Sequence, residues 1–217
     1  MGQPIRIGIS GHRKLRPEDI EALSEAVREE LKKLKKAYPH TPLELLCSLA
    51  EGGDLLCADA AEELGIPVHA ILPMEIVEYE KDFTSAGLER LHHHLDAAAE
   101  VIIPAFTENE PETMKPEFLY RQAGIYVSAH TDILIALWDG APGLYGCGTA
   151  EAVDFTLKAD YQPADGVKPT EPKGVIHIFT PRGDHTEELA GTRHYLGDWE
   201  VLRARLKALD AQNTYVS

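Results

Sequence analysis

Three glycine-containing turns carry side chains of the kind that bind phosphates and sugar hydroxyls. The first is Ser10-Gly11-His12-Arg13. Glycine allows a tight turn whose amide groups face a ligand, and an arginine guanidinium matches a phosphate or carboxylate with two parallel hydrogen bonds. The residues alone fit equally well a closed turn in which His12 and Arg13 contact nearby carboxylates, so both interpretations stay open.

The second turn runs through Ala50, Glu51, Gly52, Gly53 and Asp54 into an alanine-rich segment. Two glycines before a helix N-terminus allow a phosphate or ribose to approach the backbone closely, and we favour this role for Gly52 and Gly53. Glu51 is a candidate for ribose hydroxyls. For Asp54 we favour a helix cap that satisfies free amides.

The third turn is the richest in glycine. Gly140, Gly143, Gly146 and Gly148 fall within nine residues, between an apolar run and a helical pattern. Thr149 can cap that helix and meet a phosphate, and Asp139 and Glu151 supply acceptors for ribose hydroxyls; Cys147 lies in the same loop. The alternative is a surface loop capped by Thr149. The turn lacks the Gly-Lys-Ser/Thr of a P-loop and the Gly-x-Gly-x-x-Gly of dehydrogenases.

Short apolar runs alternate with helical patterns along nearly the whole chain. Alternation of this kind predicts an α/β fold of Rossmann-like type, with a mostly parallel sheet and helices on both faces. The expected strands are Ile5 to Ile9, Leu43 to Leu49, Val68 to Leu72, Val101 to Ile103, Asp132 to Trp138 and Val175 to Phe179. The expected helices are Pro17 to Lys36, Asp54 to Leu64, Glu75 to Asp82, Ser85 to Ala99, Phe118 to Ala129, Thr149 to Ala159 and Asp198 to Leu209.

Each of the three turns follows an expected strand. In an open α/β sheet, ligands bind outside the carboxyl ends of the strands, near the point where strand order reverses. The sequence therefore predicts one ligand site built from these turns. We expect a single domain over residues 1–217, in which 184–217 form a C-terminal helical extension.

The charge composition limits the classes of binding partner that we expect. The chain has 217 residues, 21 of them basic and 36 acidic, for a net charge of −15. Such a charge repels nucleic-acid phosphate and anionic lipid, so we predict no nucleic-acid and no membrane partner. A small anionic ligand is still allowed, because local dipoles and one arginine can hold a phosphate.

Cysteine and histidine usage predicts no metal site and no disulfide framework. The 3 cysteines are an odd number without Cys-x-x-Cys spacing. The three consecutive histidines from His92 to His94 point in different directions on a helix, which is typical of a solvated face. No signal peptide and no apolar run long enough for a bilayer is found, so we expect a cytoplasmic protein.

The turns together resemble those of the SLOG superfamily, named for the DNA-processing protein Smf and the LOG phosphoribohydrolases. The segment from Ser48 to Asp54 is similar to the Gly-x-Asp-x-x-Ala turn of the first group, and Trp138-Asp139-Gly140 with Gly146 to Thr149 is similar to a Trp-Asp-Gly…Gly-Gly-Thr pattern. The resemblance covers roughly Ile5 to Ala159. It implies a Rossmann-like domain that binds a nucleotide or phosphorylated nucleoside, and related LOG proteins make a homodimer possible.

The LOG enzymes hydrolyse the N-glycosidic bond of a nucleoside monophosphate, and the resemblance carries two of their residues over. Arg121 matches their phosphate-binding arginine, although Gln122 replaces the lysine that follows it; an alternative for Arg121 is an ion pair with Glu117. Ala152 stands where their catalytic glutamate would be, and Glu151 lies one residue earlier. Glu151 is thus the candidate catalytic residue if the protein is an enzyme.

Three hypotheses remain from the sequence. The first, which we favour, is a nucleotide-binding or nucleotide-sensing domain. The second is an N-glycosidase that acts on a nucleoside monophosphate, for which the Glu151 carboxylate must point into the cleft. The third is an interaction or scaffold protein, in which the glycines are only structural and no pocket is expected.

Overall fold

A single seven-stranded sheet forms the centre of the molecule. The computed structural model describes residues 2–104, 115–143, 146, 148–158, 165–168, 173–183 and 188–214. The strand order is β4-β3-β2-β1-β5-β6-β7, and every pair is parallel except β6 with β7. The strands are β1 (Ile5–Gly11), β2 (Leu43–Cys47), β3 (Val68–Ile71), β4 (Glu100–Ile102), β5 (Ile133–Trp138), β6 (Gly174–Phe179) and β7 (Arg193–Gly197).

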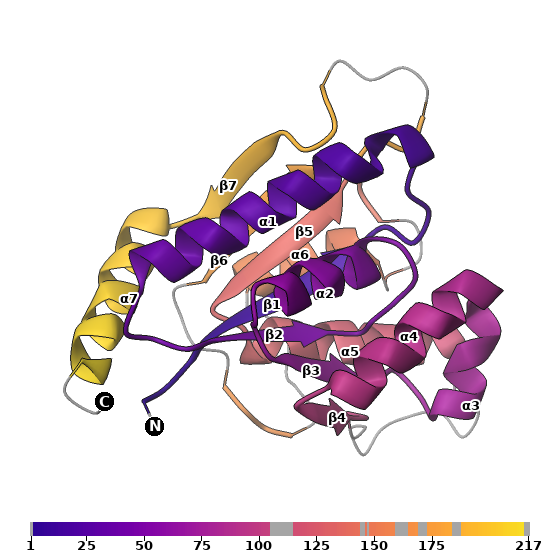
Figure 1. Ribbon diagram of the computed structural model, residues 1–217, viewed down its shortest axis with the longest axis horizontal. Helices are drawn as coiled ribbons and strands as arrows, with labels where there is room; N and C mark the ends of the chain where they lie inside the picture. The colour runs from indigo at the N-terminus through magenta and orange to yellow at the C-terminus, as the bar shows by residue number, and fades with distance from the viewer. Residues whose placement is uncertain are drawn as a thin grey trace.

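Helices cover both faces of this sheet (Figure 1). One apolar cluster joins the sheet to α1, α2, α4 and α7, and a second, smaller one joins it to α5 and α6. The helices are α1 (Ile20–Ala37), α2 (Gly53–Glu63), α3 (Ile76–Tyr79), α4 (Ser85–Ala97), α5 (Pro116–His130), α6 (Thr149–Lys158) and α7 (Trp199–Asn213), with 3-10 turns at Pro17–Asp19 and Glu80–Asp82. The predicted α/β Rossmann-like fold is confirmed.

Helix α1 shows why the spacing of apolar residues predicted the helices. Leu23, Val27, Leu31 and Leu34 recur at helical spacing, and all four are buried against the sheet. Ile20, the first residue of the helix, has the same spacing but is 45% exposed, so the buried face of α1 begins at Leu23.

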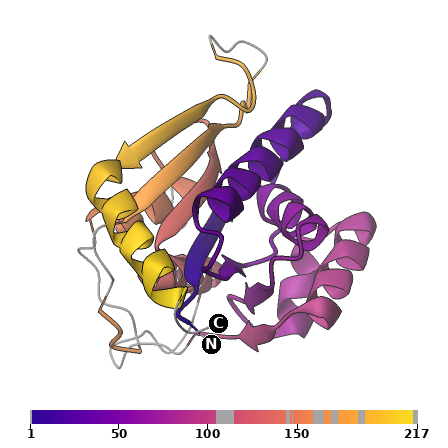
Figure 2. The same ribbon diagram turned by 60° about the vertical axis from the view of Figure 1, so that its left-hand side comes forward.

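The C-terminal segment is not the purely helical extension that we predicted. Residues Arg193–Gly197 form the antiparallel edge strand β7, which pairs with β6, before α7 begins. Helix α7 then packs Leu202 and Leu206 into the larger apolar cluster. The first and last described segments lie close together (Figure 2). Asn213 Nδ2 donates to the Gln3 carbonyl at 3.0 Å.

The strand order fixes where a ligand can bind. Successive strands from β1 to β4 add on one side, and the chain then returns through α5 to place β5 on the other side of β1. The carboxyl ends of β1 and β5 are therefore the point of reversal, where the connecting helices leave in opposite directions. Among the described helices, none is long and apolar enough to cross a membrane.

Candidate functional site

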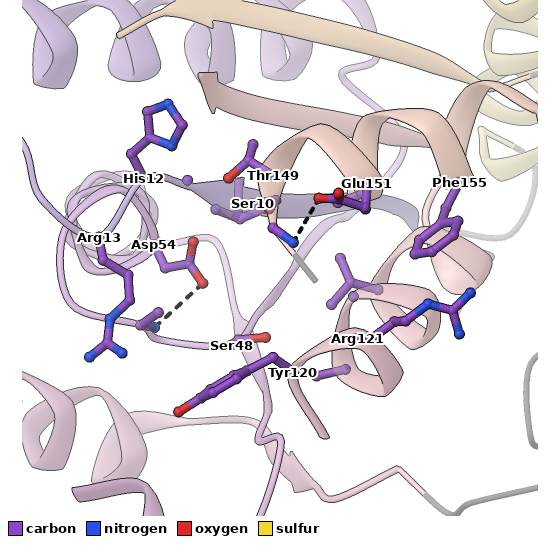
Figure 3. A pocket seen from close by; sticks show the side chains of 18 of the residues that line it. Ser10, His12, Arg13, Ser48, Asp54, Tyr120, Arg121, Thr149, Glu151 and Phe155 are labelled. Carbon is purple, nitrogen blue, oxygen red and sulfur yellow. Dashed lines mark hydrogen bonds between the residues drawn. The ribbon is translucent and has the colours of Figure 1, made fainter. Parts of the chain in front are cut away.

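A cleft of about 610 Å³ opens at this reversal point. Its floor is the end of β1, and its walls are the loop after β1, helix α5 and the start of helix α6 (Figure 3). The volume suits a ligand of nucleotide size. Of the predicted site residues, nine line this one cleft: Ser10, Gly11, His12, Arg13, Asp54, Arg121, Gly148, Thr149 and Glu151.

The cleft is basic although the chain as a whole is acidic. Among the residues that the structure describes, four cationic side chains line it, against two carboxyl groups. The cations are Arg13, Lys14, Arg121 and Arg182, and the carboxyl groups are Asp54 and Glu151. Arg13 and Arg121 stand on opposite sides of the site (Figure 3). Between them the lining is apolar and partly aromatic, with Tyr79, Tyr120 and Phe155 among its members. A site of this composition favours a flat apolar body that carries negative charge.

The glycines of the first two turns pack tightly against neighbouring backbone. A Cβ on Gly11 would lie 2.8 Å from the Gly53 Cα, and a Cβ on Gly52 would lie 2.3 Å from the Arg13 carbonyl oxygen. Gly52 also has a φ of +102°, a conformation that favours glycine. The Gly53 amide donates to the His12 carbonyl at 2.9 Å. These glycines therefore let helix α2 approach strand β1, and their predicted contact with a ligand stays a prediction.

Asp54 is not the helix cap that we predicted. Helix α2 begins one residue earlier, at Gly53, and the Asp54 carboxylate accepts a hydrogen bond from the Ala50 amide, which precedes the helix, at 3.4 Å. Asp54 is only 4% exposed. Burial raises its pKa to about 7, because hydrogen bonds from the Ala50 and Gly11 amides and the charge of Arg13 offset only part of the desolvation. The cleft thus contains a carboxyl group that titrates near neutral pH.

His12 ties the loop after β1 to the loop after β5. Its Nε2 accepts a hydrogen bond from the Asp139 amide at 3.1 Å and lies 3.2 Å from Asp139 Oδ1. Burial, and next the charge of Arg182, lower the pKa of His12, against the opposing effect of Asp139. Asp139 also accepts from the Ala141 amide at 3.1 Å, so its carboxylate closes a turn. Asp139 does not line the cleft, and the structure gives no support to its predicted contact with ribose.

Arg13 reaches across the cleft mouth to the segment after β3. Its guanidinium donates to the Asp82 carbonyl and lies 3.6 Å from the Asp82 carboxylate. It also stands 5.8 Å from the centre of the Phe83 ring. Arg13 remains 41% exposed. An anion that binds Arg13 must therefore share the guanidinium with Asp82. A contact between Arg13 and a nearby carboxylate was one of the two interpretations of this turn.

Helix α6 is capped by its own glutamate. The Glu151 carboxylate accepts from the Gly148 amide at 2.8 Å, the contact drawn in Figure 3. This is the reach of a residue in the first turn back to the N-terminal amide. Glu151 is half-buried and lines the cleft, but one oxygen is already engaged. Thr149, 7% exposed, begins the helix and faces the same cleft, where the positive end of the helix dipole favours anions.

Arg121 projects from α5 over the ring of Phe155 on α6, with 5.3 Å between the guanidinium carbon and the ring centre. No ion pair joins it to Glu117 in the described part of the chain, so the alternative of an i−4 pair is wrong. The sequence analysis missed Phe155, Tyr120 and Lys14 as lining residues. The spacing of Arg121, Gly124 and Val127, one face of α5, is the signal that could have identified this wall.

The remaining predicted residues lie elsewhere. Glu51 and Gly52 border a second cavity of about 640 Å³, which shares Arg13 and Lys14 with the cleft. There the Glu51 carboxylate accepts from the Thr84 amide at 3.0 Å and holds the start of α4, so it is not brought to a ribose site in the cleft. Gly140 borders a small cavity beside α6, and Gly146 lines none of these cavities. Cys147 lies outside the described residues.

No known family model and no curated protein matches this chain. Solved structures do. DNA processing protein A from Helicobacter pylori, described for its single-stranded DNA binding mode, aligns with a TM-score of 0.50 at 14% identity, over 94% of this chain and 74% of that chain.

Two further matches are weaker. DNA processing protein A from Streptococcus pneumoniae aligns with a TM-score of 0.41 at 14% identity, over 61% of this chain and 41% of its own. A molybdenum cofactor binding protein from Rippkaea orientalis aligns with 0.42 at 16% identity, over 74% of this chain and 75% of its own. At 14% identity, the match to the Helicobacter pylori protein shows a shared Rossmann-like fold and nothing finer.

These comparisons correct one prediction. We excluded nucleic acid as a partner because the chain carries a net charge of −15. That exclusion is wrong, since the protein with the matching fold from Helicobacter pylori binds single-stranded DNA. The net charge of the whole chain does not determine the electrostatic field inside the cleft, whose lining is basic.

Proposed function

We propose that the cleft binds a phosphorylated nucleotide or a ligand derived from one. The observation that carries this proposal is the positive charge of the lining: the described part of the chain places four cations and two carboxyl groups in the cleft, although the net charge of the chain is −15. Arg121, the dipole of α6 and Lys14 attract the phosphate, and the aromatic and apolar walls accept the base.

The position of the cleft supports the same proposal. It lies at the carboxyl ends of β1 and β5, where strand order reverses and where open α/β sheets hold their ligands. A cavity of about 610 Å³ also argues against the scaffold hypothesis, which expects no pocket.

The experiment is thermal unfolding of the protein with a panel of phosphate-bearing ligands, each with EDTA present. The panel holds nucleoside mono-, di- and triphosphates, NAD, ADP-ribose, cyclic nucleotides and short single-stranded oligonucleotides. A ligand at about one hundred times its Kd adds roughly 2.7 kcal/mol of stability, and at about 2–4 °C per kcal/mol for a chain of this size it raises Tm by roughly 5–11 °C. A selective shift supports the proposal, and a flat response to the whole panel contradicts it.

A hydrolytic function is the second candidate, and one observation favours it. Two carboxyl groups, Asp54 and Glu151, line the same cleft, and burial gives Asp54 a pKa of about 7, suited to exchange a proton with a leaving base. The engaged Glu151 carboxylate weighs against it. Overnight incubation of the protein with each nucleoside monophosphate, followed by chromatography for free base, tests it: turnover lost in both D54N and E151Q supports hydrolysis, and no release of base contradicts it.

A further inference from the structure

Away from the cleft, helices α2 and α4 bring two histidines and a glutamate together. One donor atom from each of Glu62, His93 and His94 lies within 4.8 Å of the other two. Glu62 belongs to the last turn of α2, and the histidines belong to the last turns of α4. Three consecutive histidines on one helix point in different directions and cannot bind one ion by themselves. Two of them can share an ion with a residue from the neighbouring helix α2.

The contacts within this cluster already orient the rings. His93 Nε2 lies 2.8 Å from Glu62 Oε1, and His94 Nε2 lies 2.7 Å from Asp59 Oδ1. Asp59 is also paired with Arg90. A carboxylate hydrogen-bonded to a histidine fixes the ring orientation, as second partners of metal-bound histidines do.

The burial of the three residues suits a site that is anchored on one side and open on the other. His94 is 2% exposed, whereas Glu62 and His93 are 48% and 58% exposed. Glu62 and His94 border a cavity of about 290 Å³ between the ends of α2 and α4. The buried ring therefore sets the position of an ion, and the two exposed side chains have room to close on it.

We propose that Glu62, His93 and His94 bind a divalent transition metal, with Zn²⁺ as the preferred ion, and that the metal ties α4 to α2. Two imidazoles and one carboxylate are a donor set that zinc uses, with water in the fourth position, whereas Mg²⁺ and Ca²⁺ prefer oxygen ligands alone. Bonds of about 2.0–2.2 Å require closer donors than 4.8 Å, so Glu62 and His93 move inward when the ion binds. Asp59 is a positioning residue for His94.

The test is a titration of the untagged, chelator-treated protein with Co²⁺ and then Zn²⁺. We expect one equivalent of Co²⁺ per chain, with the visible absorption of a four-coordinate site, and its displacement by Zn²⁺. His93→Ala and Glu62→Gln, both at exposed positions that tolerate change, should weaken binding at least tenfold. His92→Ala is the matched control, because His92 lies on the same helix with a similarly exposed side chain (56%) and pairs with Glu80 instead.

A second readout separates a site from adventitious histidine binding. Zn²⁺ should raise the Tm of the wild-type protein and of H92A, and should leave that of H93A unchanged, since only an ion shared by two helices stabilises the fold. The proposal is overturned if no single equivalent binds, or if H92A weakens binding as much as H93A. Because the nucleotide panel is measured with EDTA, its outcome does not depend on this site.

Discussion

At the level of single residues, anion binding in the cleft depends on which charged side chains are not already paired with a group of opposite charge. Arg13 forms an ion pair with Asp82. The Asp139 amide donates to His12, and the Asp139 carboxylate accepts from the Ala141 amide in its own turn. Arg121 contacts a ring rather than a carboxylate, so its charge is available to the cleft. The residue that the sequence singled out through its resemblance to a phosphate-binding arginine is therefore the one whose surroundings best allow that role.

Arg121→Ala should weaken the binding of the phosphorylated ligand by about tenfold or more, which corresponds to about 1.4 kcal/mol or more. A charge-assisted bond to phosphate is lost, while the apolar walls remain. Isothermal titration measures the change. Arg203→Ala is the matched control, because Arg203 also stands over an aromatic ring, that of Trp199 at 5.5 Å, but on α7. Equal affinities for R121A and the wild type would remove Arg121 from the site.

Asp54 should make stability depend on pH in an unusual direction. Its pKa in the folded chain is about 7 because of burial, above the ordinary 3.8, so the folded state holds a proton that the unfolded chain has released. The free energy of unfolding should fall as pH rises from about 4 to above 7, by up to about 1.4 kcal/mol per unit of pKa shift. Urea unfolding of the wild type and Asp54→Asn at pH 5, 6, 7 and 8 measures it.

The D54N variant is the reference for this test. Its side-chain amide cannot lose a proton, so the stability of the wild type relative to D54N should decrease steadily across the series. The exposed Asp96→Asn change, also on a helix, should give a constant difference and serves as the baseline for loss of one acidic side chain. A D54N difference that is equally constant would show that Asp54 is ionised throughout.

At the scale of elements, the close approach of α2 to β1 shapes the cleft. Gly11 and Gly53 face each other backbone to backbone, so no side chain fits at either position. Gly11→Ala should therefore destabilise the fold by about 1–3 kcal/mol through overpacking. Gly124→Ala on α5 meets nothing within 4 Å and should be neutral or stabilising by up to about 1 kcal/mol. Urea unfolding compares them, and an equal effect of both changes would contradict the packing account.

Hydrophobic periodicity and turn residues were sufficient to predict most of the strands and helices. The alternation of apolar runs with helical patterns predicted β1 to β6 and the helices between them, because each element buries one face in its own register. Strand β7 escaped notice because it is an edge strand, in which only Arg193 and Leu196 are half-buried, so it shows no continuous apolar run.

The site was predicted less completely than the fold. Turn residues that follow strands were identified, because their place at the sheet edge follows from topology. Whether a glycine faces a ligand or a neighbouring backbone is decided by tertiary packing, as Gly52 and Gly53 show. The spacing of Gly124 and Val127 along α5 indicates one part of the wall, but no local pattern reveals that Phe155 of α6 adjoins them after folding.

At the scale of the whole molecule, an acidic surface surrounds a basic cleft. The net charge of −15 opposes the approach of any anion, so binding depends on local attraction at short range. Salt screens both effects, with a Debye length near 10 Å at 0.1 M and about 3 Å at 1 M, but charges within the cleft are screened less.

Affinity for the phosphorylated ligand should fall when NaCl is raised from about 0.05 to about 0.5 M, and the fall should be smaller in R121A, because salt screens the attraction between the cleft cations and the phosphate. Equilibrium titration of both proteins across this range of salt measures it. The unphosphorylated nucleoside, which offers no charge, should bind with nearly the same affinity at every concentration. A salt response shared by both ligands would point to an effect on the protein rather than on the contact with phosphate.

Phosphate recognition by the cleft can be tested by calorimetric titration of the wild-type protein with each nucleoside monophosphate and its matching nucleoside. We expect saturable binding of at least one monophosphate at one site per chain, with at least tenfold weaker binding of the nucleoside that lacks the phosphate. Equal affinity for the two members of every pair, or no binding of any monophosphate, would contradict a cleft that recognises phosphate.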